Sequence, residues 1–145
     1  MTEKDDFDPQ DFLPYLLNQA AEASSLAFQQ VYKGRYGMLR TEWRVLFHLG
    51  VYKRLTAKEI GTRAGIHKTK VSRAVQKLAE RRLLARTRDE TDRRSEFLTL
   101  TAAGQAVYRD LRAVAHEYDT ELAARFPPQD VALLRDMLKR LAGLR

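Results

Sequence analysis

The sequence contains no cysteine, which excludes disulfide bonds, thiolate zinc sites, cysteine nucleophiles and thiol-based redox sensing. No apolar run approaches the ~18 residues that a membrane-spanning helix needs. The amino terminus does not resemble a signal peptide, because residues 1–6 are acidic where a signal peptide is basic and then apolar. We therefore expect a cytoplasmic protein that has no membrane segment.

Motifs for catalysis and metal binding are also missing. The seven glycines are scattered and form no phosphate-binding loop. His48, His67 and His116 lie in no recognisable catalytic motif, and no two of them have the i, i+4 spacing of metal ligands on one helix. We expect that the protein is not an enzyme and that it has no cofactor and no metal site.

Positive charge is present in excess, and it is concentrated in the middle of the chain. The 145 residues are 44% hydrophobic, enough for the core of one domain, and the net charge is +7. Residues 33–94 hold eighteen Lys and Arg against six acids, residues 1–32 hold one against six, and residues 95–145 hold seven of each. One basic region between acidic and neutral flanks is typical of a polyanion-binding protein, although such charge can also serve solubility alone.

The first third of the chain predicts two helices. Residues 1–10 are polar and are expected to form a loose leader. Apolar residues then recur at three- and four-residue steps and predict a helix over residues 12–33. Two glycines predict a connection over residues 33–40, and Thr41 is expected to cap a short helix that ends at Gly50.

Two further helices are expected in quick succession. Thr56 and Glu59 have the spacing of a capping box, which predicts a helix start, and Gly65 is expected to end that helix. A second helix is expected from about residue 68 to 82, and two helices joined by a tight glycine turn are typical of a helix-turn-helix. Its core-facing residues would be Val71, Val75 and Leu78.

The outward face of this second helix is rich in hydrogen-bond donors and poor in acids. Such a helix fits the major groove of DNA, where Arg or Lys pairs with guanine and Gln pairs with adenine. The alternative is an ordinary amphipathic helix with a solvated outer face. DNA contacts are expected from Lys68, Thr69, Lys70, Ser72, Arg73, Gln76 and Lys77.

After Leu83 the apolar period changes to two, which predicts a strand, a polar turn and a second strand. An arginine at such a turn could enter a narrow minor groove, with Asp92 orienting it, unless the turn is merely solvated. The expected contacts here are Arg88, Asp92, Arg93 and Arg94. Thr101 then predicts the cap of a long helix that reaches about Arg125, and Pro127 and Pro128 separate it from a last helix.

The segment from the turn to the start of the long helix resembles a known family. The pattern D-x-R, five residues and L-T-x-x-G is present as Asp92 to Arg94 and then Leu100 to Gly104, and Ser72-Arg73 starts a matching helix pattern. On these motifs the chain resembles the multiple-antibiotic-resistance regulator (MarR) family over residues 12–142. One departure is the Pro127-Pro128 pair, where the family more often has Ser or Thr before Pro as a helix cap.

The resemblance implies a mainly α fold with a small β-hairpin wing, that is, a winged helix-turn-helix with terminal dimerisation helices. Within a single regulator domain over residues 1–145, residues 41–100 would form the DNA-binding region. Residues 12–33 and 102–142 would form the interface of a homodimer that binds a pseudo-palindromic operator. The apolar stripes at both ends of the chain favour a partner independently, with an intramolecular helical bundle as the alternative.

The implied function is a sequence-specific, double-stranded-DNA-binding transcriptional regulator, a repressor that a small anionic or aromatic ligand releases. Members of the family commonly bind small aromatic acids, and the expected ligand residues are Tyr15, Asn18, Trp43, Arg44 and His48. A core Trp43 flanked by surface charges is the alternative for that pocket. The alternative function is a basic architectural or RNA-binding module without ligand control, although the helix over residues 68–82 has no aromatic residue for stacking RNA bases.

Overall fold

The computed structural model describes residues 6–92 and 94–144. The chain divides into two compact units between Leu39 and Arg40. The first unit consists of a short 3-10 helix and one long α-helix, and all the other elements belong to the second unit.

The first unit begins with the 3-10 helix Pro9–Asp11. The carboxylate of Asp8 caps it, and the rings of Phe7 and Phe12 meet edge to face with their centroids 5.1 Å apart. The described part of the expected leader over residues 1–10 therefore carries local order.

Helix α1 spans Leu13–Tyr36 and is longer than the sequence predicts. The connection expected over residues 33–40 is wrong in its first half, because Gly34 lies inside the helix. Gly37 ends the helix in the left-handed conformation at φ 61°, and its N–H donates to the carbonyl of Lys33 at 2.8 Å. The second glycine stops the helix because that backbone conformation is unfavourable for residues with a Cβ.

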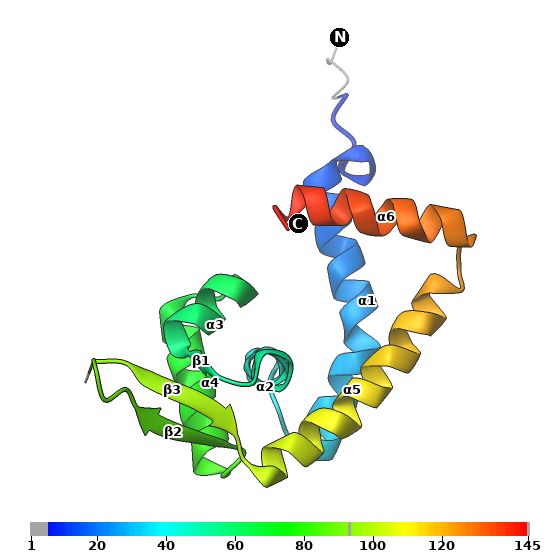
Figure 1. Ribbon diagram of the computed structural model, residues 1–145. Helices are drawn as coiled ribbons and strands as arrows, with labels where there is room; N and C mark the ends of the chain where they lie inside the picture. The colour runs from blue at the N-terminus through cyan, green and yellow to red at the C-terminus, as the bar shows by residue number, and fades with distance from the viewer. Residues whose placement is uncertain (1–5, 93, 145) are drawn as a thin grey trace. The chain divides into compact units, whose positions relative to one another are not determined.

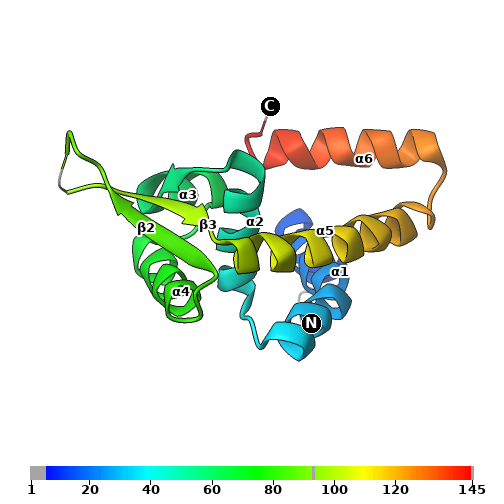
Figure 2. The same ribbon diagram turned by 60° about the horizontal axis from the view of Figure 1, so that its bottom comes forward.

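The second unit is mainly helical with a small antiparallel sheet, which confirms the predicted winged helix-turn-helix fold (Figures 1 and 2). Within the described residues the sheet has the order β1-β3-β2, and the first strand is too short for a sequence pattern to predict. The elements in chain order are α2 (Arg40–Tyr52), β1 (Leu55–Thr56), α3 (Ala57–Ala64), α4 (Lys68–Glu80), β2 (Leu84–Arg88), β3 (Glu96–Leu100), α5 (Ala102–Ala123) and α6 (Pro128–Leu141).

The expected boundaries of α2 are wrong at both ends. Thr41 lies within the first turn and does not cap the helix, and Gly50 lies inside the helix. The glycine is needed for a close approach, because a Cβ at this position would lie 2.5 Å from the ring of Tyr108 on α5. Gly50 therefore allows α5 to pack against α2 and does not end the helix.

The helix-turn-helix has the predicted caps. The hydroxyl of Thr56 accepts from the backbone N–H of Glu59, and the Glu59 carboxylate accepts from the backbone N–H of Thr56, both at 3.1 Å. This capping box starts α3, and Gly65 ends it at φ 66°. Helix α4 ends at Glu80, two residues before the predicted end, because Arg82 turns the chain at φ 59°.

The wing is the hairpin of β2 and β3, which projects beyond the helices in both views (Figures 1 and 2). Leu84 pairs with Leu100 at its base, and Arg88 pairs with Glu96 near its tip. Leu55 of β1 pairs with Leu98 on the other side of β3. The base is therefore anchored by buried leucines while the tip is left to polar residues.

The core of the second unit joins the helix pair to the sheet. The fully buried residues include Leu46, Leu49, Ile60, Leu78, Leu98 and Leu111, which come from α2, α3, α4, β3 and α5. Burial of these side chains fixes α4 from behind and leaves its other face outside.

Helix α5 begins where the sequence predicts, with the Thr101 hydroxyl accepting from the backbone N–H of Gly104 at 3.1 Å. It ends two residues early, at Ala123. Pro127 then starts α6 without a side-chain cap, as the absent Ser or Thr implies. Arg135 of α6 donates to the Asp119 carboxylate of α5 at 2.9 Å, which ties the two helices together across the bend.

Candidate DNA-binding surface

Helix α4 presents one buried face and one exposed face. Val71, Val75 and Leu78 are buried, as predicted, and Ala74 joins them. The polar residues predicted to contact DNA are all exposed and come from this one helix, so a single approaching surface can meet them together. These are Lys68, Thr69, Lys70, Ser72, Arg73, Gln76 and Lys77.

Two contacts on α4 were not evident from the sequence. His67 caps the helix, because its Nδ1 accepts from the backbone N–H of Thr69 at 3.2 Å. The amide of Gln76 donates to the Glu80 carboxylate at 3.3 Å. The i, i+4 spacing of Gln76 and Glu80 was the available signal for the second contact, whereas histidine is not among the preferred N-cap residues.

The tip of the wing is shaped by two aspartates. Asp89 Oδ1 accepts from the backbone N–H of Thr91 at 2.9 Å and from its hydroxyl at 2.7 Å. These bonds, led by the hydroxyl, lower the pKa of the Asp89 carboxyl. Asp92 Oδ1 accepts from the backbone N–H of Arg94 at 3.0 Å, and Ser95 Oγ donates to Asp92 Oδ2 at 3.4 Å.

Asp92 thus holds the backbone of the turn from which the Arg94 side chain extends. Arg88 and Arg94 are both exposed. Arg93, expected as a third arginine contact, lies outside the described residues. Arg88 and Arg94 of the wing therefore face solvent, and the carboxylates of Asp89 and Asp92 stabilise the turn beside them.

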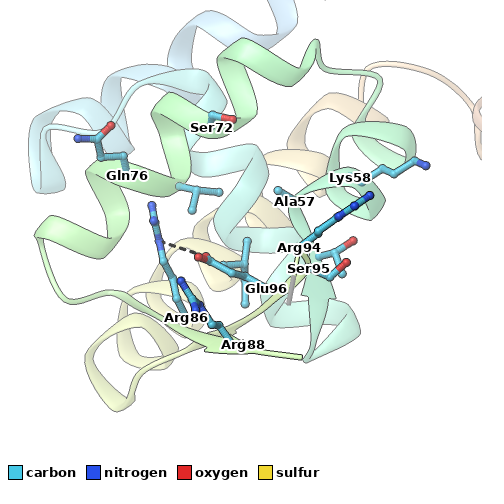
Figure 3. Close-up of a pocket in the computed structure, with 12 residues that line it drawn as sticks. Ala57, Lys58, Ser72, Gln76, Arg86, Arg88, Arg94, Ser95 and Glu96 are labelled. Atoms are coloured by element: carbon cyan, nitrogen blue, oxygen red, sulfur yellow. Dashed lines mark ion pairs between the residues drawn. The ribbon is translucent and has the colours of Figure 1, made fainter. Parts of the chain in front are cut away.

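A groove of about 680 Å³ separates α4 from the wing (Figure 3). It contains Ser72, Gln76, Arg88 and Arg94 from the predicted set, so α4 and the wing contribute to one site. It also contains residues that sequence reasoning missed as site residues. These are Thr56, Ala57, Lys58, Val75, Arg86, Ser95, Glu96 and Leu98.

Charge in the groove is mostly positive. Lys58, Arg86, Arg88 and Arg94 line it together with one acid, Glu96. Arg86 Nε lies 3.9 Å from Glu96 Oε2, across the two strands of the wing. The basic middle segment of the chain was the available signal for Lys58 and Arg86, but only the fold brings the start of α3 next to the hairpin.

The expected ligand residues fall in both units. Tyr15 and Asn18 are exposed on α1 of the first unit, and Trp43, Arg44 and His48 lie on α2 of the second. On α2 the aromatic rings form a row, with Phe47 5.2 Å from Trp43 and 4.3 Å from His48 between centroids.

The polar groups on α2 are engaged within their own unit. Arg44 donates to the carbonyl of Ala64 at the end of α3, and burial, followed by the charge of Arg40, lowers the pKa of Arg44. His48 Nδ1 lies 2.6 Å from the carbonyl oxygen of Arg44. Burial is the main cause that lowers the pKa of His48.

Comparison with known proteins agrees with this geometry. A model of the MarR family matches residues 36–95, the segment that holds the helix-turn-helix and most of the wing. Over this segment the chain belongs to the MarR family of winged helix-turn-helix transcriptional regulators. Regulators of this family are not enzymes, in agreement with the sequence analysis.

Several relatives resemble the chain over most of its length. The homoprotocatechuate degradative operon repressor of Escherichia coli is 24% identical over 92% of this chain and 90% of its own. The crystal structure of a MarR family regulator from Silicibacter pomeroyi is 25% identical, with a TM-score of 0.83 over 95% of this chain and 98% of its own. The chain spans 63% of the length of another curated relative, the regulator YwaE of Bacillus subtilis.

One solved relative is described by its effector. BpsR of Bordetella bronchiseptica, whose DNA binding is regulated by 6-hydroxynicotinic acid, matches with a TM-score of 0.86 and 20% identity over 97% of this chain and all of its own. At that identity the match shows a shared fold. No described helix of this MarR-family chain is long and apolar enough to cross a membrane.

Proposed function

We propose that this MarR-family chain is a sequence-specific regulator that binds double-stranded DNA at a pseudo-palindromic operator. The observation that carries the proposal is the exposed donor face of α4, next to a basic groove that continues onto the wing. Helix α4 would enter the major groove, and Arg88 and Arg94 of the wing would lie over the neighbouring minor groove or backbone. The protein would act as a repressor in the cytoplasm.

A homodimer is part of this proposal. Helix α6 leaves a row of large apolar side chains exposed, and α1 exposes others at Leu13, Leu16 and Leu26. Exposed apolar stripes of this size mark surfaces that a partner covers. The exposed apolar residues of α6 are Leu133, Leu134, Met137, Leu138 and Leu141.

The proposed repressor is released by a small aromatic acid, and the proposed ligand residues are Tyr15, Asn18, Trp43, Arg44 and His48. The support is the regulation of BpsR by 6-hydroxynicotinic acid and the position of Arg44. An anion that takes the guanidinium of Arg44 would withdraw a donor from Ala64, just before the turn into α4. Effector and DNA would then lower each other's affinity by the same factor.

The test begins by selecting bound duplexes from a random DNA pool with the full-length protein. A sequence-specific regulator enriches one two-fold symmetric site and binds it ~10³-fold or more above random duplex. Enrichment of no sequence would overturn the proposal and favour the architectural alternative. Titration of the selected duplex with 6-hydroxynicotinic acid and related aromatic acids then tests effector control, and unchanged affinity with every acid would contradict it.

Arg73→Ala tests the position of the reading helix. Because Arg73 is exposed at the centre of α4, its loss should weaken binding to the selected site by about 1–3 kcal/mol and relax the preference at one base pair. Arg112→Ala on the exposed side of α5 is the matched control. Equal loss on every sequence would reassign Arg73 to the phosphate backbone, and no loss would exclude α4 as the reader.

A further inference from the structure

The groove between α4 and the wing contains a carboxylate in a place where a DNA-binding surface gains nothing from negative charge. Glu96 begins β3, and its partner across the hairpin register is Arg88. Its carboxylate reaches Arg86 instead, at 3.9 Å. Figure 3 shows the two side chains directed toward each other between the strands and α4.

This ion pair contributes little to folding. The side chains of Arg86 and Glu96 are 42% and 43% exposed, and half-exposed pairs at this separation are screened by water. The buried part of the sheet is made by Leu84, Leu98 and the other apolar residues at its base. The effect of Glu96 is therefore expected on what the groove binds and not on the stability of the fold.

The groove has the chemistry of a phosphodiester site. Lys58 enters from the first turn of α3, and the three arginines enter from the wing, so cations face it from two walls. Figure 3 shows Arg94 extending toward Lys58 at one end, while Arg86 points toward α4. Ser72 on the α4 wall adds a neutral donor. Phosphate oxygens accept from donors of both kinds.

We propose that this groove holds the sugar-phosphate backbone of one DNA strand, and that Glu96 restrains sequence-independent binding by occupying Arg86. The proposal rests on the proposed function of the chain. In the free protein Arg86 is paired with Glu96, and an incoming phosphate has to compete with that carboxylate for the guanidinium. Within the described residues the carboxylate of Glu96 pairs with Arg86, and Lys58, Arg88 and Arg94 have no ion pair with it, so these three cations meet the phosphates without that competition. Glu96 thus weakens attachment to random DNA and leaves base reading to α4.

The effect of Glu96 on sequence-independent binding is measured with a random-sequence duplex of about 30 base pairs. This length covers two half-sites one helical turn apart. Glu96→Gln keeps the shape and removes the charge, so affinity for this duplex should rise about three- to tenfold. The dependence of log K on log salt concentration should steepen by up to ~0.9 per subunit, because Arg86 becomes free to contact a phosphate. Unchanged or weaker binding by Glu96→Gln would overturn the role of Glu96.

Lys58→Gln tests the groove itself. It should weaken binding equally on all sequences and reduce the salt dependence by about 0.9 per subunit, and Lys58→Arg should restore both. In an Arg86→Gln background, Glu96→Gln should give a much smaller gain, since the restrained cation is gone. Equal gains in both backgrounds would exclude competition for Arg86.

The outcomes separate this inference from the proposed function. A protein that selects a symmetric site and loses base preference with Arg73→Ala, yet shows the same salt dependence in the Lys58 and Glu96 variants, retains its function and refutes the groove. A protein that binds no DNA refutes both. Thermal unfolding of each variant checks that the fold is intact, and we expect it to be, since Lys58 is exposed, Glu96 is half-exposed and neither belongs to the core.

Discussion

At the scale of single residues, Gly104 is the last residue of the L-T-x-x-G pattern, and a close backbone contact requires a glycine there. A Cβ at this position would lie 1.9 Å from the carbonyl oxygen of Leu83. The first turn of α5 therefore packs directly against the backbone that leads into β2. Thr101 reinforces the junction, since its hydroxyl donates to the carbonyl of Arg82 at 2.6 Å.

Gly104→Ala should destabilise the protein by about 1–3 kcal/mol, because the backbone at Leu83 has to move to accommodate the methyl group. Chemical denaturation monitored by circular dichroism measures this change. Gly34→Ala is the matched control, because a Cβ there meets nothing within 4 Å and the residue lies inside α1. It should be neutral or slightly stabilising. Equal stability of the two variants would show that the junction can open without penalty.

At the scale of elements, α2 carries a histidine whose protonation opposes folding. His48 is 8% exposed, stacks on Phe47, and has the cations Arg44 and Arg63 as charged neighbours. Burial lowers its pKa in the folded state. As the pH falls below the ordinary histidine value of about 6.5, the unfolded chain takes up a proton that the folded chain resists.

The free energy of unfolding should therefore decrease between about pH 7 and pH 5, and His48→Gln should remove that part of the decrease. Denaturation midpoints measured across this range test the sign. His116→Gln, at an exposed position on α5, is the control for the loss of one histidine. A His48→Gln protein with the full pH dependence would assign the effect to other groups.

Among the elements, the wing shows how much a local pattern can predict. The period of two around the polar turn correctly predicted both strands of the hairpin, and Thr101 correctly predicted the start of α5. The pattern did not predict β1, because two residues are too few to show a period. Their pairing with β3 also depends on the hairpin already being in place. The sequence also predicted wrongly that Gly50 ends α2. The reason for a glycine there is its contact with Tyr108, and a residue so distant in the sequence cannot be found from the local pattern.

At the scale of the whole molecule, the exposed apolar row on α6 predicts self-association. Leu134 and Leu138 are one turn apart and are 42% and 41% exposed. Replacing both with Glu should convert the proposed dimer to a monomer, because two buried carboxylates per subunit would lack partners. Analytical ultracentrifugation measures the mass, and binding to the selected operator should fall with it, because one subunit reaches one half-site.

Gln129→Glu on the first turn of α6 adds a charge outside this row and should leave the dimer intact. If the double variant sediments with the mass of the parent protein, the apolar face of α6 is not the interface. If the parent protein is itself a monomer, both the proposed dimer and the proposed two-fold symmetric operator are contradicted.

The sequence by itself determined the order of the elements other than the 3-10 helix and β1, the caps at Thr56 and Thr101, the buried face of α4 and the family resemblance. All of these depend on residues close together in the chain, where helix and strand periods act directly. Only the tertiary structure brought Lys58 next to the wing, paired Arg86 with Glu96 and engaged Arg44 with the end of α3. Those contacts join residues that are distant in sequence, and exposed charges carry no period that would reveal their partners. The donor face of α4 could be read from the chain, but the groove beside it exists only once the hairpin has folded back toward α3.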